Sequence, residues 1–419
     1  MTDDPHVAGP VDEPAAEPLD DGAEVVTITI KSPPQHRLDK YLQQRLKGSI
    51  SRSQIQKLIN LGGVAVNGKL AKASTTLRVG DVIRVVLPPP PVRGIVPEPL
   101  PLDILFVDED LIVLYKQANL IVHPARGQLK GTLVNALAYH LQRQLDDRQL
   151  QRQQPTLDPE PGAAIRGLSS VGLEDYRPGV VHRLDRNTTG VMVVAKRDAT
   201  HWLLARQFEE RQTLKAYLAL VHGSPDPATA AGGCIDEPIG KHPTQREAMA
   251  VRRDPSARNS VTLWRVRRRY RGYTLVELEL KTGRTHQIRV HLSYLGCPIA
   301  GDILYGGEVI SPAEIATPPI PAGHRRYLTF ARPKDEGDAM EEKAAARGDV
   351  IMATPALHAA VLSFIHPGTH QRVRYTAPVP SPMLDLLRAL EPHRVGGPVA
   401  TDGTHVDLAS ALAGLTHRD

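Results

Sequence analysis

The chain has 419 residues, a formal net charge of +5, 41% hydrophobic residues and only 4% aromatic residues. This length predicts two or three domains with well-packed cores. Two cysteines, Cys234 and Cys297, are too few for a disulfide scaffold or a cysteine-built zinc site, so a reducing, cytoplasmic setting is expected. The sequence has no run of 18 apolar residues and does not begin with a secretory signal, which argues against membrane and secreted classes.

The charge is unevenly distributed. Residues 1–24 contain eight acidic residues and no Lys or Arg, so the remainder carries a net charge of +13. Residues 1–25 are predicted to form an acidic, disordered tail. A basic body suggests an anionic partner such as nucleic acid, although ordinary solubility charge would give the same balance.

The first folded module is predicted at residues 26–87. Leu38, Tyr41, Leu42 and Leu46 recur at helical spacing, and a second helix precedes Gly62-Gly63. Two strands around Asn67-Gly68 predict a hairpin, and 82–87 (VIRVVL) predicts a further strand. This pattern resembles the RNA-binding module of ribosomal protein S-four type. The resemblance implies RNA contacts, mainly to phosphates, from Arg37, Lys40, Arg52 and Lys57. The alternative is a solvated pair of basic helices.

A proline-rich linker is predicted at 88–101, followed by a second domain at 102–392. Strands are predicted at 106–107, 111–114, 191–195, 217–221 and 274–280, the third of them buried on both faces. A helix beginning at Asp198 is expected to place Leu203, Leu204 and Phe208 on its inner face. The predicted fold class is α+β with a mainly antiparallel mixed sheet. Insertions are expected near 144–166 and 311–352, and a tail at 393–419.

Two segments concentrate polar residues that could carry chemistry. In 178–190 (PGVVHRLDRNTTG), Asp185 lies among arginines that would keep its carboxylate ionised, as a nucleophile or a base requires. The alternative is an ordinary structural ion pair. In 281–292 (KTGRTHQIRVHL), polar residues crowd the end of a strand, which is costly unless they are used or paired. The alternative there is a solvated basic turn.

A metal site is not expected. His182, His286, His291 and His358 are the histidines that could be considered as ligands, but they show no metal-binding spacing with an acid or a cysteine. Tyr217, in 215–223 (KAYLALVHG), could stack on a flipped base beside a basic groove. A core or edge tyrosine is the alternative.

Taken in order, these segments resemble the RluA-type RNA pseudouridine synthases, most closely the RluD branch. The matching blocks also include 115–127 (YKQANLIVHPARG), 131–137 (GTLVNAL), 301–307 (GDILYGG) and 357–359 (LHA). The resemblance covers most of 26–390. The chain departs from the family pattern at Lys116-Gln117, where Lys-Pro is usual, in the loop after the HRLD motif, and at the two insertions.

The resemblance implies roles for particular residues. Asp185 is the expected catalytic aspartate, Arg284 the arginine paired with it, and Tyr217 the tyrosine that stacks on the target uracil. Substrate-binding residues are expected at His182, Arg183, Ile288 and Leu357.

The implied activity is isomerisation of uridine to pseudouridine in structured RNA by a monomeric protein, and this reaction requires no cofactor or metal. Large-subunit ribosomal RNA is the expected substrate, with transfer RNA as the alternative. A non-catalytic RNA-binding assembly factor is disfavoured because Asp185, Tyr217 and Arg284 are all present. A glycosidase-like hydrolase is disfavoured because no second acid accompanies the two polar segments.

Overall fold

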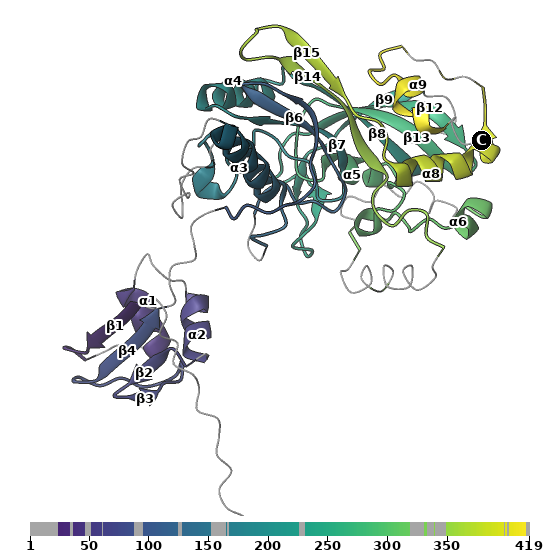
Figure 1. Ribbon diagram of the computed structural model, residues 1–419. Coiled ribbons are helices and arrows are strands. Elements are labelled where there is room, and N and C mark those ends of the chain that lie inside the picture. The colour runs from purple at the N-terminus through teal and green to yellow at the C-terminus, as the bar shows by residue number, and fades with distance from the viewer. Residues whose placement is uncertain are drawn as a thin grey trace, which may run out of the picture. The chain divides into compact units, whose positions relative to one another are not determined.

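The computed structural model describes residues 24–33, 37–46, 52–60, 62–87, 95–124, 128–151, 165, 167–225, 231–318, 331–332, 339, 349–397, 399 and 402–415. The chain divides into two compact units, Met1–Gly94 and Ile95–Asp419 (Figure 1). The division falls within the predicted linker 88–101, of which residues 88–94 lie outside the described residues.

The first unit packs two helices against a small antiparallel sheet. The helices are α1 (Leu38–Arg45) and α2 (Arg52–Asn60), and the strands follow the order β1 (Glu24–Thr29), β4 (Val82–Leu87), β2 (Val64–Val66), β3 (Lys69–Leu70). The predicted hairpin is confirmed, because Asn67 and Gly68 both have positive φ between β2 and β3, as such a turn needs. Leu38 and Leu42 are fully buried in its core. The first strand begins two residues inside the predicted acidic tail.

The second unit is built on a ten-stranded curled sheet. Its main path runs β16-β12-β13-β8-β14-β7-β6-β5, with β15 beside β14 and β9 beside β12. Strands β14 and β7 pair in parallel, and the other pairings of the described strands are antiparallel. The predicted α+β class with a mainly antiparallel sheet is therefore confirmed. The strand bounds are β5 (Asp103–Val107), β6 (Leu111–Lys116), β7 (Thr189–Ala195), β8 (Leu214–His222), β9 (Gly232–Asp236), β12 (Val261–Tyr270), β13 (Tyr273–Leu280), β14 (Leu357–Ile365), β15 (Arg372–Thr376) and β16 (Arg394–Val395).

The centre of this sheet is covered on both faces, as predicted for 191–195. Every residue of β7 is buried. Because side chains alternate along a strand, Met192 and Val194 join one core with α3 (Leu133–Gln151), whereas Val191 and Val193 join another with α4 (Asp198–Glu209). Figure 1 shows both helices at the β5–β7 end of the sheet. A separate two-stranded sheet, β10 (Ile239–Lys241) with β11 (Met249–Val251), contacts α5 (Gln287–Tyr294).

Two details of the helices differ from the sequence predictions. Leu203 was expected on the inner face of α4 but is 46% exposed, whereas Leu204 is buried. Helix α4 packs on β7 and β14, and of the neighbouring pair Leu203-Leu204 only Leu204 belongs to the packed face. The predicted insertion at 144–166 begins inside α3, and residues 152–164 lie outside the described residues. Of the insertion at 311–352, the structure describes α6 (Pro312–Ala316) and a bridge between Ile310 and Met352 at its ends.

The segment predicted as a C-terminal tail packs against the sheet. After α8 (Ser381–Leu390), it contributes β16 and α9 (Leu408–Ala411). A buried ion pair between Arg267 and Glu277 holds it, since Arg267 donates to the Val406 carbonyl at 2.9 Å and Glu277 accepts from the Val406 amide at 3.2 Å. Val406 and Leu412 are buried as a result. No helix within the described ranges has the length and hydropathy needed to cross a membrane.

Gly190 is needed where β7 meets β14. Its φ is +121°, and a Cβ at this position would overlap the carbonyl oxygen of Ala359. We expect Gly190→Ala to destabilise the second unit by about 3 kcal/mol through strain and steric overlap. Gly396→Ala is the matched control, with φ +78° but open space around the Cβ, and should cost only about 1 kcal/mol.

Urea unfolding followed by tryptophan fluorescence measures this difference. Both tryptophans, Trp202 and Trp264, lie in the second unit, so the signal reports on that unit alone. Equal midpoints for the two variants would contradict the argument.

Candidate active site

A cleft of about 470 Å³ in the second unit gathers the predicted site residues. Its lining comes from the loop before β7, the start of β8, the turn after β13, the first turn of α5 and the first residue of β14. All seven residues predicted for catalysis or substrate binding line it: Asp185, Tyr217, Arg284, His182, Arg183, Ile288 and Leu357.

The loop that carries Asp185 is fixed from below by a buried lysine. Lys116, at the end of β6, is fully buried, and its ammonium donates to the carbonyl oxygens of Gln117, Leu120 and Arg186 at 2.8–2.9 Å. Burial lowers the pKa of Lys116 to about 7, and the negative charge of Asp185 opposes this shift. The side chain of Asp185 remains 21% exposed at the base of the cleft.

The arginine beside Asp185 is Arg289, and the prediction that Arg284 pairs with this carboxylate is wrong. Arg289 Nη1 lies 3.8 Å from Asp185 Oδ2. The same guanidinium donates from Nε and Nη2 to the two oxygens of the buried Asp302, each at 2.7 Å, and lies over the Tyr305 ring at 4.8 Å. Burial disfavours the charged form of Arg289, but Asp302 and Asp185 outweigh it, so the pKa of Arg289 is raised.

Arg284 lies in the turn before α5, and its side chain bonds to the Asn259 carbonyl instead of Asp185. Its Nε donates to the Asn259 carbonyl at 3.4 Å, so it lines the cleft without an ion pair to Asp185. The sequence could not separate the two arginines, because both belong to one motif. The residue that decides between them, Asp302, follows Arg289 by thirteen positions.

His286 is a second neighbour of Asp185 that the sequence analysis considered only as a metal ligand. Tyr305 Oη accepts from the Met249 amide at 2.9 Å and shares a hydrogen bond with His286 Nδ1 at 2.7 Å. His286 Nε2 lies 4.0 Å from Asp185 Oδ1. Burial lowers the pKa of His286 despite the opposing charge of Asp185. Arg289 is therefore the permanent cation beside this carboxylate at neutral pH.

One wall of the cleft is apolar and flat. Tyr217 is 8% exposed, and Ile288 and Leu357 are also buried. Burial, followed by the charge of Asp185, raises the pKa of Tyr217 well above its usual value, so the side chain stays a neutral phenol. An aromatic ring and branched aliphatic side chains in the same lining suit a planar ring that enters beside Asp185.

His182 has a structural role, although it lines the cleft. Its Nε2 accepts a hydrogen bond from the Val193 amide at 3.0 Å, and its ring stacks on Phe208 at 4.5 Å. Burial lowers the pKa of His182 to about 3, so it stays neutral. Arg183 beside it is exposed and makes no hydrogen bond or ion pair within the described part of the chain.

The rim of the cleft is cationic. It is formed by Arg183, Arg211, Lys215, Lys281 and Arg284. Such a rim attracts an anionic ligand to an otherwise small apolar slot.

A buried glutamine of the second motif, Gln287, bonds both to the motif itself and to the neighbouring strand. Gln287 is 2% exposed, and its Oε1 accepts from Thr282 Oγ1 at 2.8 Å and from the Arg284 amide at 3.0 Å. Its Nε2 donates to the Val261 carbonyl at 3.0 Å. This bonding satisfies the buried polar groups at the strand end and fixes the turn that leads into α5.

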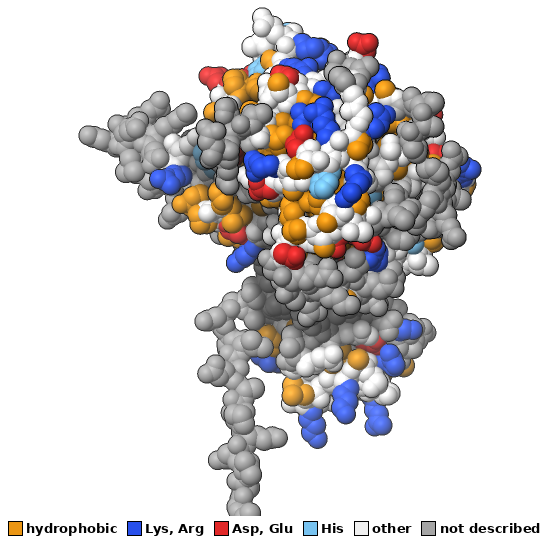
Figure 2. Space-filling view, turned by 90° about the vertical axis from the view of Figure 1, so that its right-hand side faces the viewer, with side chains coloured by type: hydrophobic (Ala, Val, Ile, Leu, Met, Phe, Trp, Pro, Cys, Tyr) orange, Lys and Arg blue, Asp and Glu red, His pale blue; other side chains and the backbone are white. Residues whose placement is uncertain are grey.

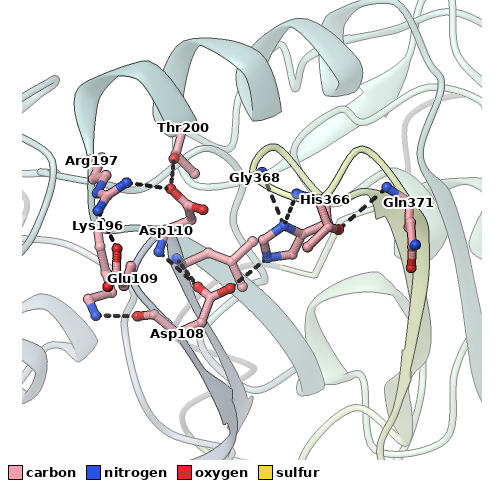
Figure 3. A network of polar contacts seen from close by, with 11 residues as sticks. Asp108, Glu109, Asp110, Lys196, Arg197, Thr200, His366, Gly368 and Gln371 are labelled. Atoms are coloured by element: carbon pink, nitrogen blue, oxygen red, sulfur yellow. Dashed lines mark hydrogen bonds and ion pairs between the residues drawn. The ribbon is translucent and has the colours of Figure 1, made fainter.

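The four histidines considered as ligands do not converge, but a different group, Asp108, Asp110 and His366, brings its ligand atoms within 4.8 Å of one another. Figure 3 shows this group where the β5–β6 turn meets the β14–β15 turn. His366 Nδ1 accepts from the amides of Gly368 and Thr369, so Nε2 carries the proton and faces Asp108 Oδ2 at 2.9 Å. The imidazole therefore has no lone pair left for a metal, and its contact with Asp108 links the two turns.

The first unit presents basic residues on its surface. Lys40 is exposed, and Arg37 is 56% exposed while contacting the buried Asp39 at 3.4 Å. Lys and Arg side chains project from this unit in Figure 2. The side chains of Arg52 and Lys57, the other predicted RNA contacts, lie outside the described residues, although both belong to α2.

Comparison with known proteins identifies both units. A family model for RNA pseudouridylate synthases matches residues 110–294, and one for the S4 domain matches 36–83. The RNA pseudouridine synthase YlyB of Bacillus subtilis is 35% identical, over 84% of this chain and 94% of that protein. An RNA pseudouridine synthase of Aquifex aeolicus is 41% identical, over 67% and 80%. The ribosomal large subunit pseudouridine synthase D of Xanthomonas campestris is 35% identical, over 90% and 95%. This chain therefore belongs to the RluA family of RNA pseudouridine synthases and carries an N-terminal S4 RNA-binding domain.

Proposed function

We propose that this RNA pseudouridine synthase modifies uridines in large-subunit ribosomal RNA, with Asp185 as the nucleophile. The observation that carries the catalytic assignment is the cleft in which Asp185, held beside Arg289, faces a buried tyrosine and an apolar wall. Support for the substrate comes from relatives named ribosomal large subunit pseudouridine synthase D, which are 35–36% identical in Xanthomonas, Vibrio cholerae and Xylella.

The reaction rearranges a nucleotide without adding atoms. The bond from uracil N1 to the ribose breaks, carbon 5 bonds to the same ribose carbon, carbon 5 loses its hydrogen and N1 gains one. Asp185 can hold a fragment covalently while the base turns, provided that its carboxylate is ionised and fixed. Arg289 acts as a positioning residue for Asp185, and its own orientation is set by Asp302.

Tyr217 supplies a stacking surface for the uracil. Since its phenol stays neutral, the aromatic face contributes rather than a phenolate charge. Ile288 and Leu357 complete the apolar lining of the slot, and Arg183 and Arg284 bind RNA phosphates at the rim. These contacts offset the few kcal/mol that a stacked, paired uridine loses when it leaves its helix.

The S4 domain adds RNA contacts of its own. Phosphate contacts of this kind increase affinity for structured RNA without selecting a sequence.

We expect Arg289→Lys to lower kcat by about a hundred-fold, because a lysine keeps the charge but cannot hold both Asp302 and Asp185 in register. Arg284→Lys is the matched control and should change KM by a small factor with little change in kcat. Steady-state kinetics on a ribosomal RNA fragment measure both values. A larger loss of kcat for Arg284→Lys than for Arg289→Lys would contradict the assignment.

Pseudouridine mapping tests the substrate. Total RNA from cells that have or lack this chain is treated with carbodiimide and read by primer extension stops. We expect stops in large-subunit ribosomal RNA to vanish without the chain and to return with wild type but not with Asp185→Asn. Loss of transfer RNA sites instead would overturn the ribosomal assignment and leave the chemistry in place.

A further inference from the structure

Helix α4 ends at the catalytic cleft, which Phe208 and Glu209 line, and exposes an aromatic side chain nearer its start. Trp202 is 62% exposed in a chain with only two tryptophans and 4% aromatic residues. The other tryptophan, Trp264, is 6% exposed and belongs to the core. An exposed indole keeps a large apolar surface in contact with water, which is unfavourable. The same surface is a strong stacking platform for a nucleobase.

Trp202 lies at a second cavity of about 500 Å³. The turn 170–175, Arg177 and His201 also line this cavity. His201 is 7% exposed, meets the indole edge-on at 5.8 Å, and its Nδ1 has no hydrogen-bond partner among the described residues. A buried polar atom without a partner is unusual, and a ligand that carries donors could satisfy it.

This cavity and the catalytic cleft share one lining residue, Val181. Arg183 lines the cleft and Arg177 lines the second cavity, and the positive charges of both, after burial, lower the pKa of His123. The two arginines therefore offer phosphate contacts to an RNA strand that occupies both cavities.

We propose that this second cavity binds an unpaired nucleobase of the RNA substrate that flanks the target uridine. The base stacks on Trp202, and Arg177 contacts the adjacent phosphate. Arg177 pairs with the exposed Asp175 at 2.9 Å, and an ion pair this exposed is weak enough for a phosphate to compete. The inference rests on the proposed function in one respect, that an RNA strand occupies the cleft.

The chemistry of the cavity favours RNA over a protein segment. Its lining combines apolar side chains with the polar or charged groups of Ser170, Asp175 and Arg177. Exposed apolar surface on α4 is limited to Trp202 and its neighbour Leu203, which does not line the cavity. Leu203→Ala is therefore a matched control, since it removes another exposed apolar side chain from the same helix.

Tryptophan fluorescence tests the proposal directly. The full chain is titrated with a 12-nucleotide single-stranded oligouridylate, which stacks on exposed aromatic rings but does not form a duplex. We expect quenching of the wild-type signal, its loss in Trp202→Phe and its retention in Leu203→Ala. Anisotropy of the labelled oligonucleotide should show about ten-fold weaker binding for Trp202→Ala and no change for Leu203→Ala.

Kinetics separate this site from the proposed function. Trp202→Ala should raise KM for the RNA substrate with little change in kcat, because the residue does not touch the reacting base. Quenching that persists in Trp202→Phe, or equal affinity of wild type and Trp202→Ala, would overturn the proposal. The oligonucleotide titration needs no turnover, so a wrong ribosomal substrate would leave its outcome unaffected.

Discussion

The bidentate ion pair between Arg289 and Asp302 is the interaction on which the active site depends. Asp302 is 1% exposed and accepts hydrogen bonds from Nε and Nη2 of Arg289. The remaining nitrogen, Nη1, therefore lies toward Asp185. A buried carboxylate and a buried guanidinium are each costly alone, so the two fix one another. The consequence is a permanent cation near a partly exposed carboxylate, in a position that a flexible lysine or the neighbouring Arg284 would not maintain.

Around this pair, several buried polar side chains bond the backbone rather than face the substrate. Lys116 ties down the loop of Asp185 through three carbonyl oxygens, and His182 accepts from the backbone of β7. Gln287 joins the turn after β13 to β12. Because these groups are saturated by internal hydrogen bonds, the residues left facing the cleft are few, and their orientation is set before RNA arrives.

Much of the fold and of the site could be predicted from the sequence, because short stretches of sequence determine these features. The apolar run 191–195 reads as a doubly buried strand, and Asn67-Gly68 reads as a hairpin turn. The order of the motifs predicted seven site residues, and all seven line one cleft. Three features could not be predicted, because each depends on a partner distant in the sequence. Asp302 decides which arginine faces Asp185, the packing on β14 leaves Leu203 exposed, and the Arg267–Glu277 pair docks the C-terminal segment.

Loss of the hydrogen from carbon 5 of uridine tests most directly whether Asp185 is essential for the reaction. Purified chain is incubated with RNA that carries tritium at this carbon, and tritium release is measured for wild type and Asp185→Asn, with RNA binding measured in parallel. The account predicts release by wild type, one hydrogen for each pseudouridine formed, and none by Asp185→Asn, which should still bind RNA. Continued release by Asp185→Asn at a rate near that of wild type would contradict the role of this carboxylate.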